Sequence, residues 1–146
     1  MSEQEDVVRV DVTLGARSYQ ILIGDGLVAW AGAEISRVLP GVRAAVVSDE
    51  NVAAVHLEAL QNSLSNSGID VTSVIIPAGE KSKSFTRLEE VVDGVIAARL
   101  ERGDVIIALG GGVIGDLAGF AAGIVRRGMN FVQIPTSLLA QVDSSV

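Results

Sequence analysis

Residues 105–125 have the sequence VIIALGGGVIGDLAGFAAGIV, an almost wholly apolar stretch that contains several glycines and one carboxylate. Its length and apolar character would suit a membrane-spanning helix. Asp116 stands near its midpoint, however, and a carboxylate there would cost on the order of 3 kcal/mol in a bilayer. We therefore predict a buried strand over 105–109, a glycine turn and a buried helix over 113–125, with no membrane contact.

Segments of strand and helix character alternate on both sides of this unit. Apolar runs predict strands, and apolar residues at helical spacing predict helices. Strands are expected over 44–48, 71–76 and 131–134, and helices over 51–67, from Ser84 to Gly103 and after Thr136. Strands joined by helices form parallel crossovers, so the pattern predicts a Rossmann-like, doubly wound, mostly parallel α/β sheet.

The first forty residues have a different pattern. Residues 8–14 alternate apolar and polar side chains, and 19–23 form a second strand-like run after a turn at 15–17. This pattern predicts an N-terminal β-hairpin. A helix is expected over 27–39, where Pro40 ends it.

Composition limits the possible functions. The chain has 146 residues, the size of one domain, and a formal net charge of −7 with 3% aromatic residues, which argues against nucleic-acid binding. It has no cysteine and one histidine, His56, so it offers no disulfide, no Cys-ligated metal and no histidine cluster. The polar start lacks the features of a signal peptide, and we expect a cytoplasmic protein. The abrupt end at Val146 indicates a piece of a longer chain.

The glycine turn, GGGVIGD at 110–116, lies between a predicted strand and a predicted helix. Glycines let a backbone approach a phosphate closely, and free N–H groups at a helix start favour an anion. Gly110, Gly112 and Gly115 match the G-x-G-x-x-G pattern, but Pro135 stands about 20 residues on, where a ribose-binding acid is expected. The alternative is a tight turn whose glycines serve packing alone.

Three further polar loops follow predicted strands. They are SDEN at 48–51, PAGEKSKS at 77–84 and PTSLLAQVDSS at 135–145. Taken singly, each is explained as well by a helix cap (Asp49, Asn51 or Ser84) or by an exposed loop. The carboxyl ends of parallel strands, however, meet at one edge of a sheet, where ligands of such folds bind. We therefore predict that the four loops form one nucleotide-binding pocket.

These motifs, together with Arg127-Gly128 and the run PTSLLAQVDSSV at 135–146, closely resemble the 3-dehydroquinate synthase family of sugar phosphate cyclases. The segment GEKSK at 79–83 also fits. The resemblance covers essentially the whole chain but only the N-terminal half of the family's protein. Ser137 departs from the family, which usually has a second threonine there. Because the hydroxyl is kept, we expect little effect.

The resemblance implies an NAD-dependent and metal-dependent lyase of the shikimate pathway. Its substrate would be the sugar phosphate 3-deoxy-D-arabino-heptulosonate 7-phosphate, and its products would be 3-dehydroquinate and phosphate. The resemblance also implies a homodimer, and a C-terminal helical domain whose side chains bind zinc or cobalt. Residues 1–146 would then be the NAD-binding domain, with no metal ligand of their own and no activity in isolation.

The family's functional residues are carried over by position in the motifs. Cofactor contacts are implied for Asp49, Asn51, Glu80, Lys83, Gly111, Gly112, Asp116, Thr136 and Ser137. Asp143 would lie where cofactor and substrate meet, and Arg127 would reach the substrate phosphate, either in its own subunit or from the partner. The open alternatives are another sugar phosphate cyclase of the inosose or valiolone synthase type, a polyol dehydrogenase-like enzyme, and a nucleotide-binding module without catalysis.

Overall fold

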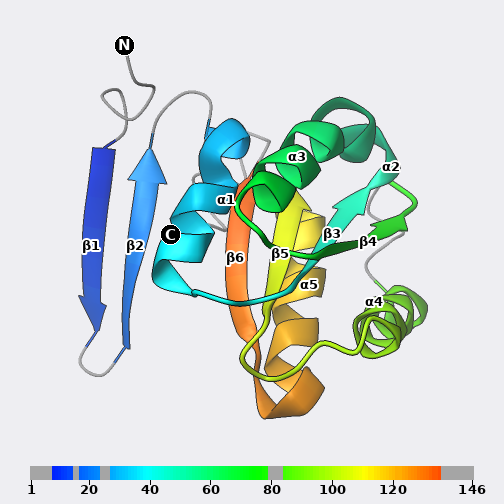
Figure 1. Cartoon of the computed structure of the whole chain (residues 1–146). Helices are drawn as coiled ribbons and strands as arrows, with labels where there is room; N and C mark the ends of the chain where they lie inside the picture. Colours follow the sequence, from blue (N-terminus) through cyan, green and yellow to red (C-terminus); the bar gives the residue numbers. More distant parts are fainter. Residues whose placement is uncertain (1–7, 15–16, 24–26, 79–83, 136–146) are drawn as a thin grey trace.

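The computed structural model describes residues 8–14, 17–23, 27–78 and 84–135. A central sheet of four parallel strands has the order β4-β3-β5-β6 (Figure 1). These strands are β3 (Ala44–Asp49), β4 (Val71–Ile76), β5 (Val105–Gly110) and β6 (Asn130–Pro135). The predicted parallel α/β sheet is confirmed, with each strand within two residues of its expected bounds.

The N-terminal segment forms the predicted hairpin. Strand β1 (Val8–Leu14) pairs antiparallel with β2 (Arg17–Ile23), from Val8 opposite Ile23 to Leu14 opposite Arg17. This pair is a separate two-stranded sheet, and neither strand joins the four-stranded sheet.

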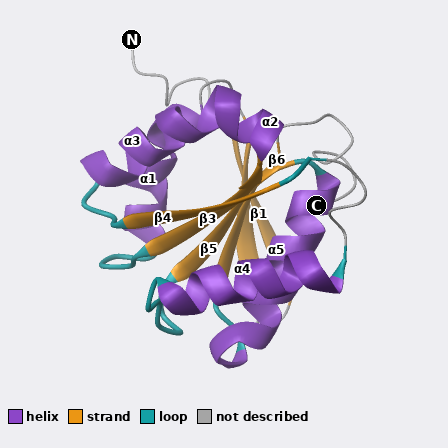
Figure 2. Ribbon diagram, turned by 90° about the vertical axis from the view of Figure 1, so that its right-hand side faces the viewer, coloured by secondary structure: helices purple, strands orange, loops and turns teal. Residues whose placement is uncertain are grey.

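Helices cover both faces of the central sheet. Figure 2 shows α1 and α3 on one side of the strands and α4 and α5 on the other. Their bounds are α1 (Leu27–Val38), α2 (Glu50–Val52), α3 (Glu58–Asn66), α4 (Phe85–Ala97) and α5 (Gly112–Ile124), with a π-helical turn, η2 (Ala53–Leu57), and a 3₁₀ turn, η4 (Val125–Arg127). The doubly wound arrangement is therefore confirmed.

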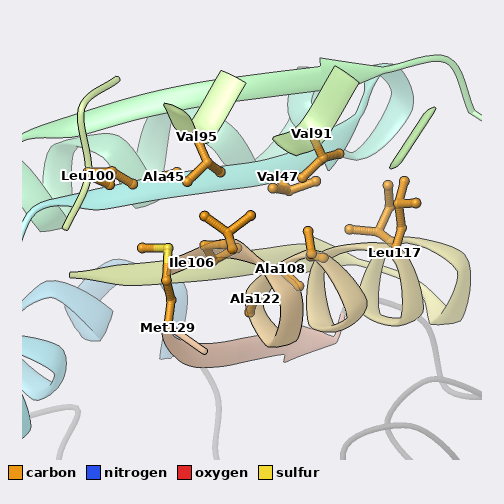
Figure 3. Close-up of a cluster of buried hydrophobic side chains, with 14 of the residues drawn as sticks. Ala45, Val47, Val91, Val95, Leu100, Ile106, Ala108, Leu117, Ala122 and Met129 are labelled. Carbon is orange, nitrogen blue, oxygen red and sulfur yellow. The ribbon is translucent and has the colours of Figure 1, made fainter. Parts of the chain in front are cut away.

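The two central strands, β3 and β5, are apolar and buried on both sides because both faces of the sheet are covered. Ala45 and Val47 of β3 contribute to a cluster with α4 and α5, which also contains Val91, Val95 and Ile114 (Figure 3). The residues between them, Ala44 and Val46, belong to a second cluster with α1 and α3, together with Ile35, Leu60 and Leu64. Period-two alternation along β3 thus supplies two cores at once.

Two helix bounds differ from those expected. The helix predicted over 51–67 is continuous in direction but contains the π-helical turn at Ala53–Leu57. The helix expected to end at Gly103 ends at Ala97, and Arg99, with a φ of 58°, takes the left-handed conformation just after it. The prediction was wrong because glycine is the usual residue at such an end, whereas here an arginine adopts that conformation.

The apolar stretch at 105–125 forms β5, the glycine turn and α5, as predicted. None of the helices that the structure describes combines the length and the apolar character that crossing a bilayer requires.

Candidate functional site

The path of the chain through the sheet creates a topological switch point between β3 and β5, and we refer to the edge beyond the ends of these two strands as the crevice. Strand β3 has β4 on one side and β5 on the other. The chain runs from β3 outward to β4, then returns past β3 to β5 and continues outward to β6. Helix α3 therefore packs on one face and α5 on the opposite face. The loops after β3 and β5 diverge, and in open α/β sheets ligands bind at this kind of switch point.

All four strands end in register at this edge of the sheet. Asp49 pairs with Ile76, and Gly110 pairs with Pro135. On the β5 side of β3, the last pair is Ser48 with Leu109. The loops that follow the four strands therefore start side by side, which confirms the predicted common edge.

The glycine turn presents an uncapped helix start to the crevice. Gly111 is the N-cap of α5, in an extended conformation with φ −81° and ψ −167°, and no side chain caps the first turn. The first N–H groups of a helix lack intrahelical acceptors and carry the positive end of the helix dipole. This geometry suits a phosphate group, which can reach the N–H groups because residues 110–112 carry no side chain.

Gly115 has a packing role one turn further along. Its N–H donates to the carbonyl of Gly111 at 3.0 Å. A Cβ at Gly115 would overlap the end of the flexible Gln133 side chain on β6, which would have to move aside. The third glycine of the pattern thus lies against β6, at the position where such glycines serve helix–strand packing.

Asp49 caps the helix that follows β3. Its Oδ1 accepts hydrogen bonds from the backbone N–H groups of Asn51 at 2.9 Å and Val52 at 2.8 Å. The capping alternative is thus confirmed for Asp49 and not for Asn51, whose side chain is exposed. Both bonds use Oδ1, and Oδ2 makes no hydrogen bond within the described part of the chain. A capping aspartate can therefore still offer one oxygen to a ligand.

Two neighbours of Asp49 make hydrogen bonds to adjacent segments at this edge of the sheet. Ser48 is fully buried, and its hydroxyl donates to the carbonyl of Leu109 at 2.7 Å. Glu50 is exposed, and its Oε1 accepts from the N–H of Ala78 at 3.5 Å, so it joins the start of the loop after β4. We singled out neither residue from the sequence. The available signal for Ser48 was a hydroxyl that ends an otherwise apolar strand.

Asp116 and Arg127 lie at different ends of α5. Asp116 is exposed on the first turns of the helix, near Gly112 at the crevice. Arg127 follows the far end of the helix, in η4. A helix of 13 residues is about 20 Å long, so within one chain the structure does not bring Arg127 to the glycine turn.

The remaining predicted site residues lie outside the described residues. They are Glu80, Lys83, Thr136, Ser137 and Asp143.

Other features of the surface lie away from the crevice. An open polar hollow of about 530 Å³ is lined by residues of α3 and the start of β4, and an apolar one of about 410 Å³ lies between α4 and the end of α5. Within the described ranges, no group of three or more His, Cys, Asp or Glu side chains is placed to hold a metal ion.

The fold is that of a Rossmann-like α/β domain, with a topological switch point between β3 and β5. A family model described as 3-dehydroquinate synthase N-terminal matches residues 73–146, half of the chain. The chain belongs to the 3-dehydroquinate synthase family.

Two curated relatives illustrate this membership. The 3-dehydroquinate synthase of Mesorhizobium japonicum is 72% identical over 139 residues, which cover 95% of this chain and 37% of the relative. That of Brucella ovis is 68% identical over 141 residues, which cover 97% of this chain and 37% of the relative. The chain thus spans little more than a third of the length of these relatives.

Solved structures of sugar phosphate cyclases share the fold. A 2-epi-5-epi-valiolone synthase from Streptomyces hygroscopicus, with NAD⁺ and Zn²⁺ bound, is 30% identical with a TM-score of 0.76, over 90% of this chain and 36% of that one. A 2-deoxy-scyllo-inosose synthase complexed with carbaglucose-6-phosphate, NAD⁺ and Co²⁺ has a TM-score of 0.84 at 24% identity, over 94% of this chain and 37% of that one.

Proposed function

We propose that this chain is the NAD-binding domain of a 3-dehydroquinate synthase. The observation that carries the proposal is the uncapped start of α5, with its side-chain-free turn at 110–112, at the switch point of a chain of this family. A pyrophosphate needs close approach and N–H donors. The turn is free of side chains at 110–112, and no side chain of the described residues caps the start of α5.

The residues around the turn fit a dinucleotide. Gly111 and Gly112 would take the pyrophosphate, while Asp49 would accept hydrogen bonds from ribose hydroxyls through Oδ2 and Asn51 would add a side-chain amide beside it. Asp116, on the exposed side of the first turns of α5, would meet the same cofactor. The other proposed cofactor contacts, Glu80, Lys83, Thr136 and Ser137, follow β4 and β6, whose ends lie at this edge.

The proposed reaction of the complete protein converts 3-deoxy-D-arabino-heptulosonate 7-phosphate to 3-dehydroquinate and phosphate, in the shikimate pathway. When bound, NAD would supply reversible hydride transfer, by which a ring hydroxyl of the substrate becomes a ketone. The ketone would acidify the neighbouring C–H, and loss of phosphate would then be possible. The part of this domain is to bind and orient the dinucleotide. Asp143 is proposed to lie where the cofactor meets the substrate.

The metal is proposed to belong to another part of the protein. The described residues offer no suitable group of ligands, and the curated relatives extend far beyond the length that this chain covers. Zinc or cobalt would therefore be held by residues of the longer protein, and no step of the reaction is assigned to a metal in this domain.

Arg127 is proposed to act across a homodimer. Its backbone lies about 20 Å from the glycine turn along α5, which favours a role in the site of a second subunit over one at its own glycine turn. An arginine that binds the substrate phosphate from this position would then reach the site of a second subunit.

A second candidate is another sugar phosphate cyclase, because the solved structures with this fold include an inosose synthase and a valiolone synthase. Identities of 68–72% to curated 3-dehydroquinate synthases favour the first proposal. A polyol dehydrogenase-like enzyme or a binding module without catalysis would release phosphate neither from the heptulosonate phosphate nor from glucose 6-phosphate.

The test is an assay of phosphate release by the protein expressed from the complete reading frame, with NAD and zinc or cobalt. We expect turnover on the order of 1 s⁻¹ or more with the heptulosonate phosphate, and none with glucose 6-phosphate. Turnover of glucose 6-phosphate alone would identify a different cyclase. The 146-residue chain on its own should bind NAD weakly and release no phosphate, and ordinary turnover by it would show that the site is misplaced.

A further inference from the structure

Ser48 occupies a special place between the two strands that form the crevice. It pairs with Leu109, and this is the last paired position between β3 and β5. Its hydroxyl donates to the carbonyl oxygen of Leu109 at 2.7 Å, and the residue is fully buried. The next residues are Asp49 on one strand and the glycine turn on the other.

The position matters because the two strands separate directly after it. The chain beyond β3 turns to the face covered by α3, and the chain beyond β5 turns to the face covered by α5. Regular pairing between the strands cannot continue past such a divergence. The Ser48 hydroxyl supplies one more bond between them, at the peptide group that joins Leu109 to Gly110.

The other restraints on the glycine turn come from the backbone: Gly110 pairs with Pro135 on β6, and the Gly111 carbonyl accepts from the N–H of Gly115 at 3.0 Å. Residues 110–112 carry no side chains, and no side chain caps α5 at Gly111. On the β3 side of the turn, the side-chain restraint is the Ser48 hydroxyl, which holds the peptide group between Leu109 and Gly110. A buried hydrogen bond of normal length fixes that group far better than an exposed one, because water does not compete for it.

We propose that Ser48 is a positioning residue of the cofactor site, which sets the geometry of the glycine turn through the carbonyl of Leu109. This inference rests on the proposed function, because it concerns how the turn binds a dinucleotide. Ser48 itself does not touch the ligand.

The test compares Ser48→Ala with Ser63→Ala in the protein from the complete reading frame. Ser63 is also a buried serine with a 2.9 Å hydrogen bond, accepted from the N–H of Gly32, and it lies between α1 and α3. Both variants lose one buried hydroxyl, so similar losses of stability are expected. Calorimetry gives the Kd for NAD, and ¹⁵N-glycine labelling reports the backbone signals without ligand.

In Ser48→Ala we expect the signals of Gly110, Gly111 and Gly112 to shift and the Kd for NAD to rise roughly tenfold. In Ser63→Ala the signal of Gly32 should shift, with those of the turn and the Kd unchanged. If Ser48→Ala does not fold, Ser48→Cys replaces it, since a thiol of similar size is a weak donor.

The inference would be overturned if Ser48→Ala left the signals of Gly110, Gly111 and Gly112 or the Kd for NAD unchanged. An equal rise of that Kd in Ser63→Ala, or failure of both Ser48 variants to fold, would also overturn it. Absence of NAD binding by the unmutated protein would refute the proposed function itself. Normal binding by that protein, with no effect of Ser48→Ala, would refute only the role of Ser48.

Discussion

Asp104 accepts a hydrogen bond from the backbone N–H of Arg43 at 2.8 Å, and so ties the residue before β3 to the residue before β5. Its other oxygen, Oδ2, accepts from the N–H of Glu101 at 2.7 Å and from the Arg43 guanidinium at 3.2 Å. Burial by itself raises the pKa of Asp104, but the backbone N–H groups of Arg43 and Glu101 and the Arg43 charge together outweigh it and lower that pKa below 3.8.

Replacement of Asp104 by Asn should therefore destabilise the fold in a pH-dependent way. An amide has one acceptor oxygen where the carboxylate uses two, so we expect a loss of about 1–3 kcal/mol at pH 7. The folded-state pKa lies below the unfolded value, so the carboxylate's contribution is complete above about pH 5 and disappears as the pH falls through the folded-state pKa.

Urea unfolding from pH 7 to pH 3 measures this effect, and the difference in unfolding free energy between the two proteins should narrow as the pH falls. Asp93→Asn is the matched control, because Asp93 is exposed on α4. A gap between wild type and Asp104→Asn that stays constant from pH 7 to pH 3 would contradict the assignment.

Gly32 should tolerate no side chain. Its N–H donates to the Ser63 hydroxyl, and a Cβ there would overlap the backbone carbonyl of Ser63, so α1 and α3 would have to separate. We expect Gly32→Ala to cost about 1–3 kcal/mol by overpacking. Gly123→Ala on α5 is the control, because a Cβ there meets open space, and it should stabilise by up to about 1 kcal/mol. Equal thermal unfolding midpoints for wild type and Gly32→Ala would show that α1 and α3 are not closely packed at Gly32.

The sequence predicts this fold well because its signals are local and agree with one another. The apolar runs of β3 and β5 are buried on both faces, and each is bounded by turn residues. Helix ends were less predictable. Arg99 follows α4 in a left-handed conformation that glycine would adopt more readily, and its carbonyl accepts a hydrogen bond from the Arg43 guanidinium, a contact distant in sequence.

Asp49 should determine the preference for NAD over NADP. Its carboxylate would accept hydrogen bonds from the ribose hydroxyls of NAD and would repel the 2′-phosphate of NADP. Alanine would also remove the helix cap, at a cost of about 1 kcal/mol. Asp49→Asn is a more specific test than alanine, because it removes the charge while its amide oxygen can still cap α2. We expect unchanged stability and a narrower ratio of NADP to NAD dissociation constants. Equal affinity of the unmutated protein for the two dinucleotides would contradict the role of Asp49.

The site was less predictable than the fold. Parallel strands dictate that four loops share one edge, so Asp49 and Gly111 could be placed there from the pattern alone. The pattern offered the Asp49 cap only as an alternative to ligand binding, and the structure shows that Asp49 makes it. The bond from Ser48 to Leu109 could not be predicted, because it depends on side-chain geometry between strands distant in sequence. The position of Arg127, at the far end of α5, follows from the helix length once the sheet order is known.

Arg127 should act in the site of the partner subunit. Arg127→Ala and Gly111→Val subunits are each expected to be inactive as homodimers. When the two are mixed and allowed to exchange, each mixed dimer contains one complete site, so activity should return to about a quarter of the wild-type value. An active monomer, or no recovery after verified exchange, would show that Arg127 does not work across subunits.

The central claim is that the glycine turn binds the pyrophosphate of NAD, and calorimetry of Gly111→Val against Gly123→Val tests it most directly. Gly111 has a φ of −81°, which valine can adopt, so the fold should survive. The added side chain would fill the space of the pyrophosphate, and the Kd should rise at least tenfold. Gly123→Val, at the other end of the same helix, should bind as the wild type does. A folded Gly111→Val protein with wild-type affinity for NAD would contradict the account and leave the turn with a packing role alone.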